Sequence, residues 1–530
     1  MWNSKRDVLT IVGLATCIKV LLVWTYRSTD FEVHRNWLAI TYSRPINEWY
    51  IEDSSQWTLD YPPLFAWLEW LLSQVAVLVD PEIVKIENEN YASDRCVIFQ
   101  RFSVICTDIV LIYAAVVWHG ILYPQTRGLP ILFQPLVLVG LILNPGLLIV
   151  DHIHFQYNGI LTGIMLLAIA RTYQGSVWWG ALWFSILLNM KHIYAYIAPP
   201  FFVYLLSSYV LAKPFSVSRI AYRLAHLGTV VLTVFTVSFL PFMLHGQLKS
   251  ILSRLFPLKR GLVHAYWAPN TWALYAGADK LLEIIATRTG HQVARSSLTS
   301  GLVGDAQFAV LPDVPPALTI VAAILLMLPS LIPLFRRPNP TKFIQSVVHC
   351  GLVSFLVGFH VHEKGILIPL LSLLPLAIIN RSLAGVYVLL SAVGHFCLFP
   401  LIITREETFI KAVLAAFYGI YITYALGCVH RYQHLSRWGQ LYLFGLVPLF
   451  IYTELLGHVL TPQLPFLPLM ATSVYCTFGV HACFLRILVV TFDEIKEARH
   501  NFRSNSLKLG DGQIDETLDI PLDADNRKTR

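Results

Sequence analysis

Residues 129–150 read LPILFQPLVLVGLILNPGLLIV, a stretch without a charged residue. About 20 mainly apolar residues cross the hydrocarbon core of a bilayer as a helix. The run 315–335 is also apolar on every face, whereas the strands of a membrane β-barrel alternate over about 10 residues. Because lipid offers the backbone no hydrogen bonds, such runs form helices. We therefore predict an all-α polytopic membrane protein.

The composition supports this class and excludes others. Hydrophobic residues make up 56% of the 530-residue chain and charged residues 13%, where a soluble domain has roughly a quarter charged. We expect about 12 to 14 transmembrane helices from the apolar runs. The basic residues behind the net charge of +7 are scattered over short loops and do not form one basic surface. We therefore predict that the protein contacts membrane lipid and binds no nucleic acid. The eight cysteines form no CxxC pair and are expected to pack inside the protein.

The start of the chain suggests its orientation. Lys5 and Arg6 precede an apolar run over residues 8–25, and no small-residue cleavage site follows it. We interpret this run as a retained first span with its basic end in the cytoplasm, which places the next loop in a lumen.

Polar segments divide the rest of the chain. We predict one membrane domain over 1–492, with an acidic, tryptophan-rich lumenal loop at 26–64 and a second large loop at 246–314. The charged tail 493–530 is poor in aromatic residues, and we expect it to be cytoplasmic and disordered.

The first loop holds candidate catalytic carboxylates in Thr29-Asp30-Phe31-Glu32. A carboxylate held at the membrane surface is suited to act as a general base on a hydroxyl group. Asp60, before Tyr61-Pro62-Pro63, is a further candidate because the prolines restrict the backbone around it. Spacing alone leaves open that Asp30 and Glu32 are solvated loop acids and that Asp60 only precedes the next span.

Polar groups also interrupt apolar sequence at three later places. Such groups are costly at membrane depth and mark functional sites by default, with an ordinary lumenal turn as the alternative. Their cations and donors suit a phosphate group. The candidates are His152, His154, Gln156, Lys191, His192, His362 and Lys364. For Glu363 two roles stay open, a part in the site or a structural pairing with one of these cations.

A metal site is the competing interpretation, since His-x-His occurs at His152 and His154 and again at His360 and His362. On a helix, residues two apart point to opposite faces, so neither pair chelates unless the backbone is locally extended. No His-Glu-x-x-His is present. We expect no catalytic metal.

Four separated motifs carry a family resemblance over nearly the whole membrane region. They are Thr29-Asp30-Phe31-Glu32-Val33-His34-Arg35-Asn36-Trp37, Trp57-Thr58-Leu59-Asp60-Tyr61-Pro62-Pro63, Asp151-His152-Ile153-His154-Phe155-Gln156-Tyr157-Asn158 and Val361-His362-Glu363-Lys364. In this order they resemble the eukaryotic dolichyl-phosphate-glucose-dependent α-1,3-glucosyltransferases, two enzymes that act in succession on the N-glycan precursor.

The resemblance implies a GT-C membrane glycosyltransferase in the endoplasmic reticulum, with its active site facing the lumen. It implies dolichyl phosphate glucose as the donor, a dolichyl-diphosphate-linked oligosaccharide as the acceptor, inversion at the transferred sugar and no divalent metal or other cofactor. The family's catalytic base corresponds to Asp30, and Glu32 is expected to orient the loop.

Two further stretches look like the member that adds the second glucose. They are Asn189-Met190-Lys191-His192-Ile193-Tyr194 and Arg260-Gly261-Leu262-Val263-His264-Ala265-Tyr266-Trp267-Ala268-Pro269-Asn270. His264, Tyr266 and Trp267 are candidates for binding the acceptor sugars, with a loop packed on the membrane surface as the alternative.

A secondary transporter is the candidate function from another class, because intramembrane His, Lys and Glu often serve transport. Transporters usually show matched halves with Gly- or Pro-broken spans at corresponding positions. We find neither in this sequence. The long acidic first loop also favours an enzyme.

Overall fold

Helices account for the architecture. The computed structural model describes residues 2–256, 261–264, 267–291, 293, 308–431 and 435–510, with side chains from 5 to 493. Within these ranges every regular element is a helix, and the only β-type pairing is an isolated parallel bridge between Val263 and Val361. The predicted all-α class is confirmed.

Ten helical segments in the described ranges are long and apolar enough to cross a membrane. They are Asp94–Thr126 (α4 and α5), Leu136–Phe155 (α6, α7 and the π-helix η3), His192–Val210 (η4, α10 and η5), Val217–Leu244 (α11), Pro316–Arg336 (α14), Pro340–Val357 (α15), Arg381–Leu401 (α17 and η7), Thr408–His430 (α18), Arg437–Leu460 (α19, η8 and α20) and Leu467–Asp493 in α21 (Leu467–Gly510).

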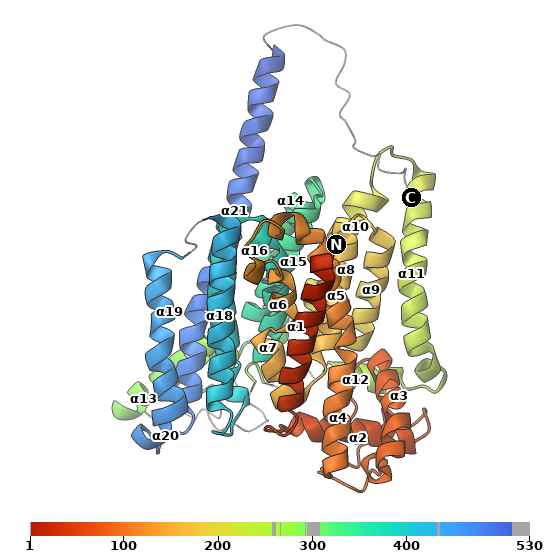
Figure 1. Ribbon diagram of the computed structural model, residues 1–530, viewed down its shortest axis with the longest axis vertical. Helices are drawn as coiled ribbons and strands as arrows, with labels where there is room; N and C mark the ends of the chain where they lie inside the picture. Colours follow the sequence, from red (N-terminus) through yellow and green to blue (C-terminus); the bar gives the residue numbers. More distant parts are fainter. Residues whose placement is uncertain are drawn as a thin grey trace.

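This count is lower than the 12 to 14 expected because other helices of the bundle are shorter or carry more charge. α1 (Trp2–Leu21) includes four charged residues, and α8 (Asn158–Tyr173) and α9 (Val177–Met190) have 16 and 14 residues. All three nevertheless stand among the long helices (Figure 1). α8 packs between α5 and α9, which explains why a short helix is stable there.

The first polar loop folds into helices at one end of the bundle. α2 (Thr29–Ser43) lies across this end, and α3 (Pro63–Val79) and the start of α4 lie beside it (Figure 1). Pro62 and Pro63 start α3, since proline is tolerated in a first helical turn. Much of the loop predicted at 26–64 is therefore helical. We call this the first-loop end of the bundle.

The second large loop reaches the same end. It contains α12 (Leu248–Leu255) and α13 (Thr271–Arg288), and Asn270 caps α13 by accepting from the N–H groups of Trp272 and Ala273. α13 packs against α15 and α21. The Val263–Val361 bridge joins this loop to the segment between α15 and α16 (Leu367–Ile379), which ends with the short helix η6 (Glu363–Ile366).

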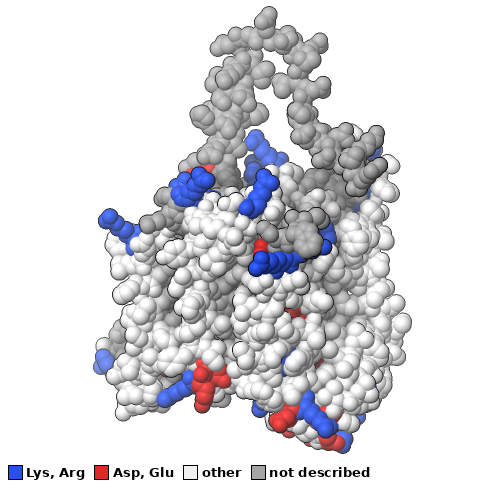
Figure 2. Space-filling model, viewed as in Figure 1, with Lys and Arg blue, Asp and Glu red and all other residues white. Residues whose placement is uncertain are grey.

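Charged side chains gather at the two ends of the bundle. In Figure 2 the face shown has a broad, nearly uncharged belt between Lys and Arg at one end and mixed charges at the other. Such a belt is what the hydrocarbon core of a bilayer requires. The distribution agrees with the membrane class predicted from composition.

The predicted boundary at 492 falls inside α21, which continues to Gly510. The first part of the predicted tail is therefore helical where we expected disorder. Its sequence explains this, because Glu, Lys, Ala and Arg are strong helix formers. Residues 511–530 lie outside the described part, so disorder there stays a prediction.

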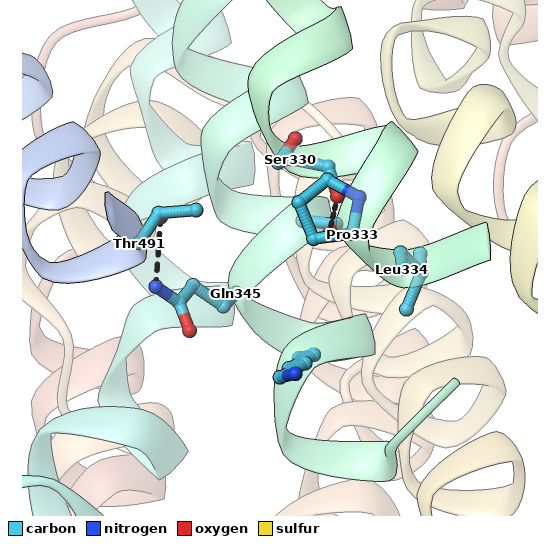
Figure 3. A pocket seen from close by; sticks show the side chains of 7 residues that line it. Ser330, Pro333, Leu334, Gln345 and Thr491 are labelled. Carbon is cyan, nitrogen blue, oxygen red and sulfur yellow. Dashed lines mark hydrogen bonds between the residues drawn. The ribbon is translucent and has the colours of Figure 1, made fainter. Parts of the chain in front are cut away.

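A small pocket with about 270 Å³ of empty volume lies where α14, α15 and α21 meet. Figure 3 shows Gln345 donating to Thr491 across it, beside Ser330, Pro333 and Leu334. None of the candidate site residues from the sequence lines this pocket.

Candidate active site

Asp30 lies in the first turn of α2, and hydrogen bonds fix where that turn begins. The Ser28 hydroxyl oxygen accepts from the Asp30 N–H at 3.1 Å and thereby caps the helix. The same hydroxyl donates to the His154 carbonyl at 2.6 Å, and the Ser28 N–H donates to that carbonyl at 3.1 Å. The start of α2 is thus tied to the end of η3, with Asp30 at the positive end of the helix dipole.

Three side chains meet the Asp30 carboxylate at one oxygen, Oδ2. Gln156 Nε2 donates to it at 2.5 Å, Lys364 Nζ donates at 3.0 Å and His154 Nε2 lies 3.2 Å away. Lys364 Nζ is also 3.4 Å from His154 Nε2. The Asp30 side chain keeps 24% of its surface exposed. The structure therefore brings four predicted site residues together from three distant segments and leaves the carboxylate accessible.

An unusual backbone turn aims two of these side chains. Phe155 ends η3 with φ of +88°, a conformation that non-glycine residues rarely adopt and that costs of order 1–3 kcal/mol. Its buried ring packs edge-on against Phe31 of α2, with centroids 5.0 Å apart. The residues on either side of this turn, His154 and Gln156, both contact Asp30. Packing thus holds a strained turn where the candidate base lies.

Asn158 extends the hydrogen-bond network behind Gln156. Its Nδ2 donates to Gln156 Oε1 at 2.8 Å and to Asp151 Oδ1 at 2.9 Å, and its Oδ1 accepts from Lys191 Nζ at 3.2 Å. Gln156 is therefore oriented with its amide N–H toward Asp30. Asn158 is not among the predicted site residues, although it lies in the polar motif that held three of them.

Lys191 is a second cation near the carboxylate. Its Nζ lies 4.8 Å from the Tyr61 ring centroid, a cation–π contact. Burial and the charge of Lys364 lower the pKa of Lys191 to about 8, while the carboxylates of Asp30 and Asp60 act in the opposite direction. Two lysines and two predicted carboxylates therefore share one electrostatic environment, and Asp60 itself is half-buried.

The charge on Asp30 is stabilised by its neighbours. Burial raises the pKa of this carboxyl, but the Lys364 ammonium and His154 together outweigh burial and hold the pKa of Asp30 well below its usual range. Hydrogen bonds to the charged form act in the same direction. Asp30 is therefore an ionised carboxylate at neutral pH, the form that accepts a proton.

Glu32 has a different task from Asp30. Its two oxygens accept from Arg35 Nη2 at 2.7 Å and from Arg35 Nε at 2.8 Å, and both side chains are buried. Arg35 in turn donates to the carbonyls of Ile83 and Lys85. The pair holds α2 against the segment after α3, which agrees with the expected orienting role and makes Glu32 a structural carboxylate.

His152 lies away from Asp30. Its Nε2 is 2.9 Å from Asp108 Oδ2, and the same oxygen accepts from Lys19 Nζ at 2.6 Å. All three side chains are buried among α1, α5 and η3. His152 is thus committed to an internal ion-pair network, so its prediction as a donor-binding residue is not supported by its position.

His192 and the candidate acceptor-binding residues lie at separate places in the fold. The centroid of the His192 ring lies 5.6 Å from that of the Phe256 ring. The centroids of the His264 and His362 rings are 3.9 Å apart, with the rings tilted by 37°. Trp267 is only 2% exposed, and its ring centroid lies 5.1 Å from that of Phe466. This burial does not support the prediction that its face stacks on a sugar. Tyr266 lies outside the described residues.

The fold and site together define a polytopic membrane protein with an accessible carboxylate, flanked by cations, at one end of its bundle. The chain belongs to the ALG6, ALG8 glycosyltransferase family, whose model matches residues 15–487. It is therefore a glycosyltransferase with the predicted all-α GT-C architecture, and the transporter alternative is set aside.

Relatives from animals and fungi match almost the whole chain. A Mus musculus protein named dolichyl pyrophosphate Glc1Man9GlcNAc2 alpha-1,3-glucosyltransferase is 45% identical over 496 residues, 89% of this chain and 93% of its own length. The Neurospora crassa protein of that name is 44% identical, covering 91% and 97%. A Drosophila melanogaster protein with the same name, marked probable, is 46% identical, covering 89% and 91%.

Proposed function

We propose that this chain transfers glucose from dolichyl phosphate β-D-glucose to the terminal glucose of the monoglucosylated, dolichyl-diphosphate-linked oligomannose precursor. The product carries a new α-1,3 linkage, and the site faces the lumen of the endoplasmic reticulum. The observation that carries the proposal is the ionised Asp30 carboxylate, bound to Lys364 in a chain of this family.

The choice of acceptor rests on the relatives. Their printed names specify Glc1Man9GlcNAc2, an oligosaccharide that already carries one glucose. Identity of 44 to 46% over nearly the full chain supports the same acceptor here. The first enzyme of the pair is the alternative, and it would use the acceptor without glucose.

Asp30 is the general base in this mechanism. All contacts to its carboxylate in the described part of the chain fall on Oδ2, so we assign Oδ1 to the acceptor hydroxyl. As the 3-hydroxyl oxygen attacks the anomeric carbon, its proton passes to Oδ1. The bond from the anomeric carbon to the donor phosphate oxygen breaks on the opposite face. This single displacement inverts the β-linked donor to an α-linked product, as one base suffices for inversion.

Lys364 and Lys191 stabilise the leaving group. The departing dolichyl phosphate gains one negative charge, which fixed cations in a partly dehydrated site stabilise more strongly than water does. Lys364 contacts Asp30 directly and Lys191 reaches the site through Asn158. These cations supply the charge stabilisation that a divalent metal provides in other transferases, and the proposed reaction has no metal step.

Two acceptors distinguish the proposed enzyme from its alternative. Purified protein is given dolichyl phosphate glucose with either the unglucosylated or the monoglucosylated lipid-linked oligosaccharide, and products are separated by mass. We expect transfer to the monoglucosylated acceptor only. Transfer to the unglucosylated acceptor only would identify the first enzyme, and transfer to neither with a properly folded preparation would refute the donor or acceptor class.

A further inference from the structure

A cluster of three histidines lies beside the catalytic segment. His360 and His362 follow the end of α15, where His360 has φ of +52° and Val361 pairs with Val263. This extended stretch does not have the helical geometry that would send residues two apart to opposite faces. His264, next to Val263, completes the cluster, and one ring nitrogen from each histidine lies within 4.8 Å of the other two.

The ring of His360 is oriented as a metal ligand would be. Its Nδ1 donates to the Gly261 carbonyl at 2.7 Å, and its backbone N–H donates to the Leu262 carbonyl at 3.0 Å. A carbonyl only accepts, so the proton is on Nδ1 and the lone pair is on Nε2. Metal-binding histidines usually donate their other ring N–H to a carbonyl or carboxylate in this way.

A buried carboxylate next to the cluster calls for a cation. The Glu363 side chain is 3% exposed, and its Oε2 lies 4.0 Å from His264 Nδ1. Within the described residues neither Glu363 oxygen has a hydrogen bond to another residue. A carboxyl group buried in this way stays neutral unless a cation pairs with it or it coordinates a metal. The three rings indicate a metal site, and the neighbouring carboxyl group is a further oxygen ligand within reach of it.

We propose that His264, His360 and His362 bind one Zn²⁺ ion, and that the Glu363 carboxylate, 4.0 Å from His264 Nδ1, turns toward the ion to become the fourth ligand. Neutral imidazoles and a carboxylate are ligands that Zn²⁺ takes in tetrahedral sites. With bonds of about 2.1 Å, neighbouring ligand atoms of a tetrahedral site are about 3.4 Å apart. Nitrogens within 4.8 Å of one another therefore approach by at most about 1.4 Å on binding.

The ion would act as a structural clamp outside the transfer step. It would join residues 261–264 of the second loop to 360–363, directly before Lys364. Because Lys364 donates to Asp30, fixing this segment keeps the cation in place at the candidate base. Closed four-ligand zinc sites serve this structural role.

Metal content tests the proposal without reference to glucosyl transfer. The full chain is purified in detergent from zinc-supplemented cells without chelator, and bound metals are measured by mass spectrometry. We expect about one zinc per chain, falling at least fivefold in His264→Ala and His360→Ala. The matched control, His458→Ala, changes an exposed histidine and should keep its zinc.

Cobalt gives a second measurement that needs no variant. After the zinc is stripped with a strong chelator, added Co²⁺ should produce the intense visible bands of a tetrahedral site, and zinc should raise the thermal unfolding temperature Tm. Wild-type protein with no stoichiometric zinc and no such bands would overturn the proposal. So would variants that keep their zinc. If the wild-type protein contains no zinc and His264→Ala has a raised KM for the acceptor, the cluster binds the acceptor sugars and not a metal.

Discussion

Replacing Lys364 with methionine should move the acid limb of the reaction to higher pH. Lys364 Nζ lies 3.0 Å from Asp30 Oδ2, and both side chains are mostly buried, at 16% and 24% exposure. At an effective dielectric constant near 20, a pair at this distance interacts by about 5 kcal/mol before desolvation is subtracted. Opposite charges this close typically lower a carboxyl pKa by about 1 to 3 units.

The sign follows from the native pKa. The pKa of Asp30 is held low, so activity is present above that pKa and is lost as the pH falls through it. Removing the ammonium raises the pKa, and the loss then begins at higher pH. The acid limb of kcat/KM reports the free enzyme, so it should shift upward by about 1 to 3 units.

The assay is a pH series of kcat/KM with the acceptor and dolichyl phosphate glucose both kept well below their KM values, so that the free enzyme is the form that titrates. Lys364→Arg is the matched control, because it keeps the charge and should leave the acid limb nearly in place. The absolute rate of Lys364→Met will also fall, since the phosphate loses a cation, so the shape of the profile is the readout. An unshifted acid limb in Lys364→Met would refute the electrostatic coupling of Lys364 to Asp30.

Three further results are expected. Gln156→Leu removes a hydrogen bond to a charged carboxylate, worth about 1.5–3 kcal/mol, and should lower kcat/KM about 10- to 100-fold in the same assay; a wild-type rate would contradict this. Arg35→Ala leaves Glu32 buried without its ion-pair partner and should destabilise the fold by about 3–5 kcal/mol. The measurement is the Tm, which should fall; an unchanged Tm would argue against the structural role of the pair. EDTA added at the start of a short assay should leave the rate unchanged, and a strict requirement for added Mg²⁺ or Mn²⁺ would count against the metal-free step.

The helical membrane fold was predictable because each apolar run carries its own signal. Runs such as 129–150 require a helix wherever lipid surrounds them. The signal is weaker for α3, whose 17 residues are mainly apolar but lie with α2 at the first-loop end. The buried Glu69 of this helix accepts a hydrogen bond from His34, with 2.7 Å between Oε1 and Nδ1. Hydropathy does not show this contact. Packing between distant segments decides where such a helix lies.

Most residues of the site were predictable from the sequence, but their proximity in the fold was not. Asp30, His154, Gln156 and Lys364 each stand out as polar residues near apolar sequence. Lys364 is 334 positions from Asp30, and no local pattern reports that they touch. The convergence depends on tertiary packing, including the strained turn at Phe155.

Some positions differ from the expectation for physical reasons. Trp267 looked like a sugar platform because it lies in a polar loop, yet the fold buries its ring against Phe466. Asn158 was not among the candidates, because its link between Gln156 and Lys191 arises only from tertiary packing. The His360 and His362 pair was set aside on helical geometry, whereas the backbone there is extended next to Val263.

The most direct test of the central claim is the turnover of Asp30→Asn on the monoglucosylated acceptor, measured together with its affinity for dolichyl phosphate glucose. Asparagine keeps the shape of the side chain but does not accept the proton. We predict that kcat falls by about 10²- to 10⁴-fold while donor binding stays within a few-fold of wild type. Asp53→Asn, a change at an exposed acid of the same loop, should retain full activity. An Asp30→Asn enzyme within tenfold of the wild-type kcat would contradict the assignment of Asp30 as the base.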